Sequence, residues 1–414
     1  MRSTRCGSNR GPSFGVCWGI HFQTPDGVPE GGFEGTACYA GRVRALIPSG
    51  AAASGHNHFN SMRLAMALLV VWSHCFAIYF GDEGSEPISV LLNGRYNAGN
   101  IAVRVFFVIS GLLIARSFEL SGSVGSYFRK RISRIYPGFL VAVTICSFIV
   151  VPLFSSWWRV SAFEFVKWAA LNLALQGAML PSNAFAGNPI SAINGALWSI
   201  SFEFWCYIGV AVAGVLGMLR RRWLMLGALV AFMVGKAWLD ATGRKPGGGL
   251  IEAVFGWPYL WFSMAPCFLA GILGHQHADR IPRSRVAAVA LLLATIAAAH
   301  LCGSSRVIFD LVFVPGLAYV VFFVAFSPLS FSDLGARGDF SYGTYLYGFP
   351  IQQMIKSSLV IPFVVYVPLC TLLALLAGVL SWFVVERHFT HPKSQRSVPH
   401  KAGTCRHLRD GAAS

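Results

Sequence analysis

Two ionisable side chains, Arg63 and His74, stand eleven residues apart in the apolar stretch from Met62 to Phe80. An ionisable group in a membrane helix costs roughly 2.5–3.5 kcal/mol on insertion scales, so two in one helix need a reason. Eleven residues make about three helical turns, which places both side chains on one face, about 16 Å apart along the axis. An arginine can bind phosphate, and a neutral imidazole can take a proton from a hydroxyl. The stretch predicts an anion contact and a general base at two depths; a structural histidine hydrogen-bonded between helices is the alternative.

A carboxylate stands in the middle of another apolar stretch, NGALWSISFEFWCYIG, at Glu203. Counted from an expected helix start near residue 192, it lies about 16 Å deep, close to the level of His74. An anion at that depth is costly unless it is paired with a cation. We therefore expect Glu203 to orient His74, and a clamp between helices is the structural alternative.

Four cations follow one another closely in YFRKRISRIYP, just before Pro137, which can open the next apolar span. Cations at a membrane surface suit a phosphorylated ligand, such as the nucleotide end of coenzyme A. Membrane topology and anionic lipid headgroups explain them equally well. These cations are Arg129, Lys130, Arg131 and Arg134.

Two further stretches combine apolar and polar side chains. VRVFFVISGLL contains Ser110 and Gly111, which are small enough to admit a ligand or a neighbouring helix. DFSYGTYLYGFPIQQ contains Tyr342 and Tyr345, and its Pro350 is expected to break the helix and free backbone carbonyls. Interfacial anchoring is the alternative for Tyr342. We assign Trp198, Ser201, Tyr342 and Tyr345 to a substrate channel.

The composition shows which elements must position these residues. Of 414 residues, 55% are hydrophobic and only 12% are charged, about half the charged fraction of a soluble chain. The net charge of +16 lies mostly in segments between apolar runs, as the positive-inside rule predicts, so we do not expect nucleic acid as a partner. The ten cysteines form no CxxC pair, and we expect no metal site.

The predicted fold is an all-α polytopic membrane protein of about ten transmembrane helices. An eleventh apolar run, 163–180, carries several polar residues and is placed as a re-entrant or interfacial outer helix, because this parity keeps the basic clusters and both termini in the cytoplasm. Residues 1–58 are expected to be a disordered tail or a spurious extension, 59–389 the membrane domain, and 390–414 a basic cytoplasmic tail. The predicted spans are 62–80, 101–118, 137–154, 192–217, 223–239, 257–273, 286–302, 307–326, 341–359 and 361–384.

From about Phe59 to Phe389 the chain resembles the integral-membrane acyltransferase-3 family, which includes bacterial sugar and exopolysaccharide O-acetyltransferases. The resemblance lies in FNSMRLAMALLVVWSH, FFVISGLLIARSF, RKRISRIYPGFL, ALWSISFEFWCYIG and DFSYGTYLYGFPIQQ, in the family's order. It departs from the family's pattern at Asn60, where Asp is frequent, and at Gly348, near which many members have His.

This resemblance implies transfer of an acyl group, usually acetyl, from cytoplasmic acyl-CoA to a saccharide hydroxyl at the outer face of a bacterial inner membrane. Acyl-CoA is then a co-substrate, no cofactor is tightly bound, and the acceptor is a saccharide or a lipid-linked oligosaccharide. Arg63 and His74 match positions that are regarded as essential in the family, and Glu203 matches the Glu after its Trp-Ser pair, so we predict these three as catalytic. Arg131 and Arg134 match the family motif implicated in handling the acyl donor. With Arg129 and Ser110, these two arginines form our predicted donor-binding set.

Direct transfer is preferred over a Ser110 acyl-enzyme, because the sequence pairs no obvious base with that serine. A glycolipid or polysaccharide transporter, or flippase, is the rival function, although we find no repeated halves of the kind common in transporters. The other membrane-bound acyltransferase superfamily fits less well, since its catalytic histidine lies in a late span.

Overall fold

The computed structural model describes residues 46–47, 58–302, 306–327 and 338–390. The chain divides into Met1–Arg42 and Val43–Ser414, and every described residue belongs to the second part. The predicted tails, 1–58 and 390–414, lie almost wholly outside the described residues. The predicted membrane domain, 59–389, contains all the named helices except the last residue of the final one.

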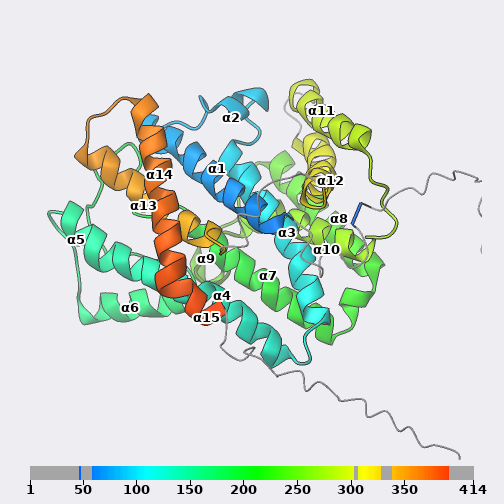
Figure 1. The fold of residues 1–414 in the computed structure, drawn as a ribbon, viewed down its shortest axis with the longest axis horizontal. Coiled ribbons are helices and arrows are strands. Elements are labelled where there is room, and N and C mark those ends of the chain that lie inside the picture. The colour runs from blue at the N-terminus through cyan, green and yellow to red at the C-terminus, as the bar shows by residue number, and fades with distance from the viewer. Residues whose placement is uncertain (1–45, 48–57, 303–305, 328–337, 391–414) are drawn as a thin grey trace, which may run out of the picture. The chain divides into compact units, whose positions relative to one another are not determined.

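The described residues form helices and no named strand, which agrees with the all-α prediction (Figure 1). The longer helices are α1 Phe59–Phe80, α3 Ala98–Glu119, α4 Val124–Ile145, α6 Ala162–Leu173, α7 Trp198–Val215, α8 Arg222–Thr242, α10 Pro258–Gln276, α11 Arg285–Leu301, α12 Arg306–Ala325, α13 Ser341–Ser358 and α14 Phe363–Ser381. The shorter ones are α2 Pro87–Leu91, α5 Val151–Phe154, α9 Gly249–Phe255 and α15 Arg387–Thr390, and π-helical turns Cys146–Val150 and Trp382–Glu386 continue α4 and α14.

Seven helices in the described part of the chain are long and apolar enough to cross a membrane. Three further predicted spans coincide with the helices α10, α11 and α13, which do not meet both requirements, so the count of ten stays a prediction. At 12 residues α6 is too short to cross, and its re-entrant placement also stays a prediction. The seven helices are Phe59–Phe80, Ala98–Glu119, Val124–Phe154, Trp198–Val215, Arg222–Thr242, Arg306–Ala325 and Phe363–Thr390.

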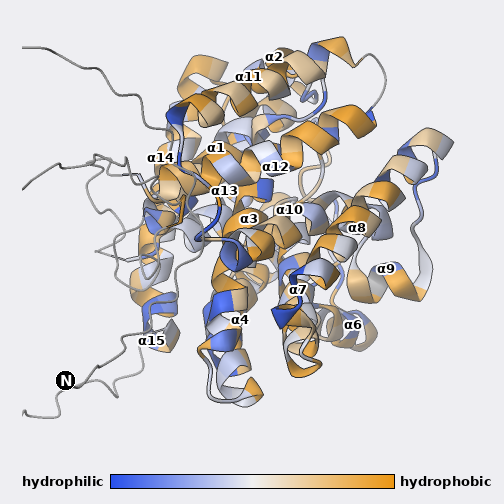
Figure 2. Cartoon of the chain, turned by 90° about the vertical axis from the view of Figure 1, so that its right-hand side faces the viewer, coloured by the Kyte–Doolittle hydropathy of each residue, from blue (hydrophilic) through white to orange (hydrophobic). Residues whose placement is uncertain are grey.

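Two predicted helix starts are wrong. Pro137 lies inside α4, which begins thirteen residues earlier, where the Ser123 side chain accepts a hydrogen bond from the Ser126 amide. The basic stretch is therefore helical, and Figure 2 shows it as hydrophilic residues along α4 beside the largely hydrophobic α3. α7 begins at Trp198 rather than near 192, because the preceding residues form an irregular segment.

The predicted break at Pro350 is also wrong, since α13 runs unbroken through this residue. A proline has no amide hydrogen, so the carbonyl of Leu346, four residues earlier, loses its helical partner. The side-chain amide of Asn194 donates to that oxygen at 2.9 Å. The expected freed carbonyl thus exists, and it anchors the segment before α7 to α13.

The helix α1 lies centrally and contacts α3, α13 and α14, while α3 also contacts α7 and α10 (Figure 1). Gly111 on α3 and Gly271 on α10 face each other so closely that a Cβ atom on either would overlap backbone of the other helix. Small residues allow this kind of approach in membranes, where packing replaces the hydrophobic effect between helices. The crossing fixes α3, which carries residues of both cavities described below.

A separate group of buried charges joins α8, α10, α12 and the segment before α3. The Lys236 ammonium lies 2.6 Å from an Asp310 oxygen and 2.7 Å from an Asp240 oxygen. Tyr96 and Tyr259 donate hydrogen bonds to the other oxygen of Asp310 and of Asp240, respectively. The cluster is therefore internally paired, as buried charges must be.

Candidate active site

A cavity of about 820 Å³ lies between α1, α3, α4, α7 and α13. Among the described residues that line it, five are cations and two, Glu203 and Asp339, are carboxylates, so this lining favours an anionic ligand. The cations come from two helices: Arg63 from α1, and Arg129, Lys130, Arg131 and Arg134 from α4. This cavity brings together all the residues that the sequence analysis predicts to bind the donor, including Ser110, and we name it the donor-side cavity after that prediction.

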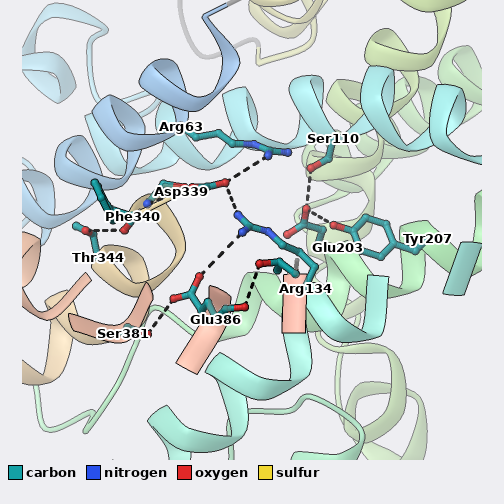
Figure 3. Close-up of polar contacts among 12 residues, drawn as sticks. Arg63, Ser110, Arg134, Glu203, Tyr207, Asp339, Phe340, Thr344, Ser381 and Glu386 are labelled. Atoms are coloured by element: carbon teal, nitrogen blue, oxygen red, sulfur yellow. Dashed lines mark hydrogen bonds and ion pairs between the residues drawn. The ribbon is translucent and has the colours of Figure 1, made fainter. Parts of the chain in front are cut away.

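Asp339, at the start of α13, links the two helices that supply the cations. Figure 3 shows the Arg63 and Arg134 guanidinium groups reaching the same Asp339 oxygen, at 3.8 and 2.5 Å. Burial raises the pKa of Asp339, but the charges of Arg134 and Arg63 and the Ser341 hydrogen bonds outweigh it, and the net pKa is lowered. Asp339 therefore remains ionised and holds both arginines at the wall of the cavity.

Two side chains at this end have polar atoms without hydrogen-bond partners. Arg131 Nε is buried without one, although its Nη2 donates to Ser117 Oγ at 3.4 Å. Glu386, 1% exposed, accepts from Ser381 Oγ through Oε1 and lies 4.0 Å from Arg134 through Oε2, which lacks a hydrogen bond. Because Arg131 also lines the cavity and a guanidinium forms charge-assisted hydrogen bonds with phosphate, it is a candidate phosphate contact.

Glu203 does not orient His74, contrary to the sequence-based prediction. Its Oε1 accepts a hydrogen bond from Ser110 Oγ at 2.7 Å and one from the Tyr207 hydroxyl at 2.6 Å (Figure 3). Within the described residues no hydrogen bond joins Glu203 to His74. Equal depth in the membrane was a poor guide, because it says nothing about which way each helix turns its side chain. The pairing also gives Ser110 the carboxylate that the sequence analysis did not find.

His74 lines a second, smaller cavity of about 270 Å³. We name it the acceptor-side cavity, because the sequence analysis predicts that His74 takes a proton from the acceptor hydroxyl. Its ring packs edge-on against Phe349, with the centroids 5.2 Å apart. Polar side chains from the segments around α3 face the same space, among them Glu83, Asn97 and Asn100. The lining therefore combines one imidazole, one carboxylate and two amides, which suits a ligand with hydroxyl groups.

Two residues, Val103 of α3 and Tyr345 of α13, line both cavities and so form a common wall. The Tyr345 hydroxyl donates to the Ala196 carbonyl at 2.6 Å and lies 2.7 Å from Ser199 Oγ, which fixes its ring. Arg63 and His74 lie on the same helix, one in each cavity. The predicted polar face of α1 therefore serves two adjoining spaces.

The predicted channel residues divide between these spaces. Trp198 lines the acceptor-side cavity, Tyr342 lines the donor-side cavity, and Tyr345 lines both. Ser201 lines neither, because its hydroxyl turns back to the Trp198 carbonyl at 3.2 Å.

Sequence reasoning missed two acidic residues. Asp339 is the first letter of DFSYGTYLYGFPIQQ, so its place before a polar helix was a usable signal. Glu83 lies in a polar connector, where no sequence signal distinguished it from its neighbours.

A family model described as an acyltransferase domain matches residues 57–383. An O-acetyl transferase of Shigella phage Sf6 is 28% identical over 341 residues, covering 80% of this chain and 96% of that protein. Nodulation protein 10 of Rhizobium leguminosarum bv. viciae is 26% identical over 326 residues, covering 72% and 84%. The acyltransferase MdmB of Streptomyces mycarofaciens is 33% identical over 132 residues, covering 31% of each. No solved structure matches this chain.

Proposed function

This chain belongs to the acyltransferase-3 family, and we propose that it moves an acetyl or other short acyl group from acyl-CoA to a saccharide hydroxyl. The observation that carries the proposal is the pair of adjoining cavities, one cationic and one containing His74, with a single wall between them. A group transferred through that wall leaves a charged donor on one side and joins a neutral acceptor on the other. The relative from Shigella phage Sf6, named an O-acetyl transferase, supports ester formation.

The donor's phosphates would lie against the cations of α4 in the donor-side cavity. Arg131 lines this cavity, and Arg134 is already held in place by Asp339. Arg63 lies on the same wall, where it can bind phosphate or polarise the thioester carbonyl. The pantetheine arm would then extend past Ser110 towards Val103 and Tyr345, and place the thioester carbon at the common wall.

His74 would act as general base on the acceptor side. Its imidazole takes the proton of the acceptor hydroxyl as the oxygen attacks the thioester carbon. A carbon–oxygen bond forms, the carbon–sulfur bond breaks, and the coenzyme A thiolate leaves with the electron pair. The proton on His74 then passes to the thiolate or to solvent, and the products are an ester and free coenzyme A.

Direct transfer remains our proposal, although the reason first given for it is wrong. Ser110 does have a carboxylate partner, Glu203, and so meets the first requirement of an activated nucleophile. It lines only the donor-side cavity, however, whereas His74 lines only the other. An ester on Ser110 would therefore lie away from the base that must activate the acceptor. We assign Ser110 and Glu203 to holding the donor.

The proposed setting is a bacterial inner membrane, with both termini and the cations of α4 on the cytoplasmic side. That orientation gives the donor-side cavity access to cytoplasmic acyl-CoA, and the acceptor-side cavity would face the outer surface. It follows from the positive-inside rule, and the seven apolar helices support a multi-pass protein.

The test is to add acetyl-CoA labelled in its acetyl group to inverted membrane vesicles that contain the protein. We expect label in saccharide in an alkali-labile form, and none when His74→Ala replaces the wild type. A transporter or flippase would move its substrate across the membrane and would form no labelled ester. Saccharide labelling that persists in the His74→Ala vesicles would overturn the assignment of the base.

A further inference from the structure

Glu83 lies in the connector between α1 and α2, outside the spanning helices, and lines the same cavity as His74. It is the one carboxylate among the residues described as lining that cavity, which include no lysine or arginine. The electrostatics therefore oppose those of the donor-side cavity. An acidic ligand is disfavoured here, while hydroxyl groups can donate hydrogen bonds to the carboxylate.

One oxygen of this carboxylate is already fixed. Glu83 Oε2 accepts a hydrogen bond from the Asn97 side-chain amide at 2.6 Å. Asn97 is in turn held by the start of α3, because its Oδ1 accepts from the backbone and side-chain amides of Asn100 at 2.7 and 2.8 Å. The other oxygen, Oε1, has no hydrogen-bond partner within the described residues. The group is thus oriented by the protein and still has acceptor capacity.

The groups around Glu83 raise the pKa of its carboxyl group. Burial raises the pKa of Glu83, the Asn97 hydrogen bond lowers it, and the neighbouring carboxylates of Asp82 and Glu86 raise it further, so the net pKa lies above the ordinary range. The side chain is nonetheless exposed, so a ligand hydroxyl that donates to Oε1 would replace water there.

The volume and the lining of the cavity further restrict which ligands can bind there. Its volume of about 270 Å³ is near the lower end for small-molecule pockets, which begin at about 300 Å³, so it suits a single ring. Trp198 and Phe349 supply aromatic surface, and the polar groups gather at Glu83, Asn97 and His74. Aromatic surface together with acceptors for several hydroxyls fits a sugar ring, which has apolar faces and a polar edge.

We propose that Glu83 positions a neutral saccharide in the acceptor-side cavity by accepting a hydrogen bond from one hydroxyl while another hydroxyl faces His74. This inference rests on the proposed function and adds a residue and a charge rule to it. Because the described lining carries a carboxylate and no lysine or arginine, a sugar bearing its own carboxylate should be a poor acceptor. Removing the charge of Glu83 should therefore weaken binding of the neutral acceptor. It should also reduce the preference of the enzyme for the neutral acceptor over the acidic one.

The experiment uses the full chain in lipid nanodiscs, acetyl-CoA as donor, and two matched probes, methyl α-glucopyranoside and methyl α-glucopyranosiduronic acid. Glu83→Gln keeps an oxygen for the Asn97 amide and removes the charge. Asp82→Asn is the control, because Asp82 carries the same charge one residue earlier and lines neither cavity. Acetyl transfer and acetyl-CoA hydrolysis are measured separately, with KM for each substrate.

For Glu83→Gln we expect KM for the neutral glycoside to rise about tenfold, the scale of one hydrogen bond to a charged group. The KM for acetyl-CoA should stay within about twofold, and the preference for the neutral over the acidic probe should fall. Asp82→Asn should behave as wild type. An unchanged acceptor KM in Glu83→Gln, or equal changes in both KM values, overturns the inference.

Different outcomes of this experiment overturn the role of Glu83 and the proposed function. Hydrolysis of acetyl-CoA without transfer to the neutral glycoside would overturn the assignment of a neutral saccharide site. It would still support the proposed use of acetyl-CoA as the donor. Transfer to both probes with equal efficiency in wild type overturns the charge rule alone. No turnover of acetyl-CoA by any route overturns the proposed function itself.

Discussion

Replacing Val103 by alanine tests whether the wall between the two cavities limits the size of the transferred group. Val103 is 7% exposed and lines both cavities, so its two methyl groups occupy space that a longer acyl chain would need. Tyr345, the other shared residue, is fixed by two hydrogen bonds and offers less room to adapt. Val103→Ala should therefore improve the use of propionyl-CoA relative to acetyl-CoA.

One methylene in an apolar pocket is worth about 1–3 kcal/mol of discrimination, or roughly 10- to 200-fold in kcat/KM. Because the wall has only partial control of the acyl chain, we expect the lower end, about a tenfold rise in the ratio of propionyl to acetyl transfer. The assay is competition between the two donors, with both esters counted by mass spectrometry. Val105→Ala is the matched control, since Val105 is buried on the same helix and lines neither cavity. Equal ratios in both variants would refute the reasoning.

Three other variants test the remaining roles. Ser110→Ala should raise the KM for acyl-CoA by about 10- to 100-fold, the worth of one hydrogen bond to a charged group. The wild type should form no hydroxylamine-sensitive acyl-protein, and complete loss of transfer in Ser110→Ala would instead favour an acyl-enzyme. The lowered pKa of Asp339 stabilises the fold above the ordinary aspartate pKa of about 3.9, and this contribution disappears as pH falls through the folded-state value. Asp339→Asn should therefore melt lower at pH 7 yet lose less on acidification, and parallel melting curves would contradict this. Lys236→Met removes the cation that pairs with Asp240 and Asp310 and should destabilise the protein by about 3–5 kcal/mol, measured by thermal unfolding in detergent. An unchanged Tm would show that the cluster contributes little.

Most helix positions could be predicted from the sequence, because apolar runs of membrane length identify themselves by composition alone. The start of α4 could not, since a basic stretch is as compatible with a surface connector as with a helix lying at that surface. The carbonyl freed by Pro350 was foreseeable from covalent chemistry, whereas its acceptance of the Asn194 amide required the tertiary structure. Features that depend on neighbouring residues could be predicted from the sequence. Contacts between residues distant in the sequence could not.

The candidate site was predictable only in part for the same reason. The residues on α1 and α4 came from their types and spacing, and the structure places all of them on cavity walls. The pairing of Glu203 with His74 failed because depth along a helix leaves the direction of the side chain open. The division into two cavities depends on Val103 and Tyr345, two ordinary side chains that gain their role only when α3 and α13 pack together.

We assign donor binding and base catalysis to separate, adjoining cavities. The most direct measurement compares Arg131→Ala with His74→Ala for two quantities, the Kd for acetyl-CoA by calorimetry in nanodiscs and the rate of acetyl transfer. Arg131→Ala should weaken Kd about tenfold or more through the lost charge-assisted contact. His74→Ala should leave Kd unchanged and lower transfer by about 10²- to 10⁴-fold, the usual worth of a general base. Equal loss of acetyl-CoA binding in both variants, or full transfer by His74→Ala, would contradict the account.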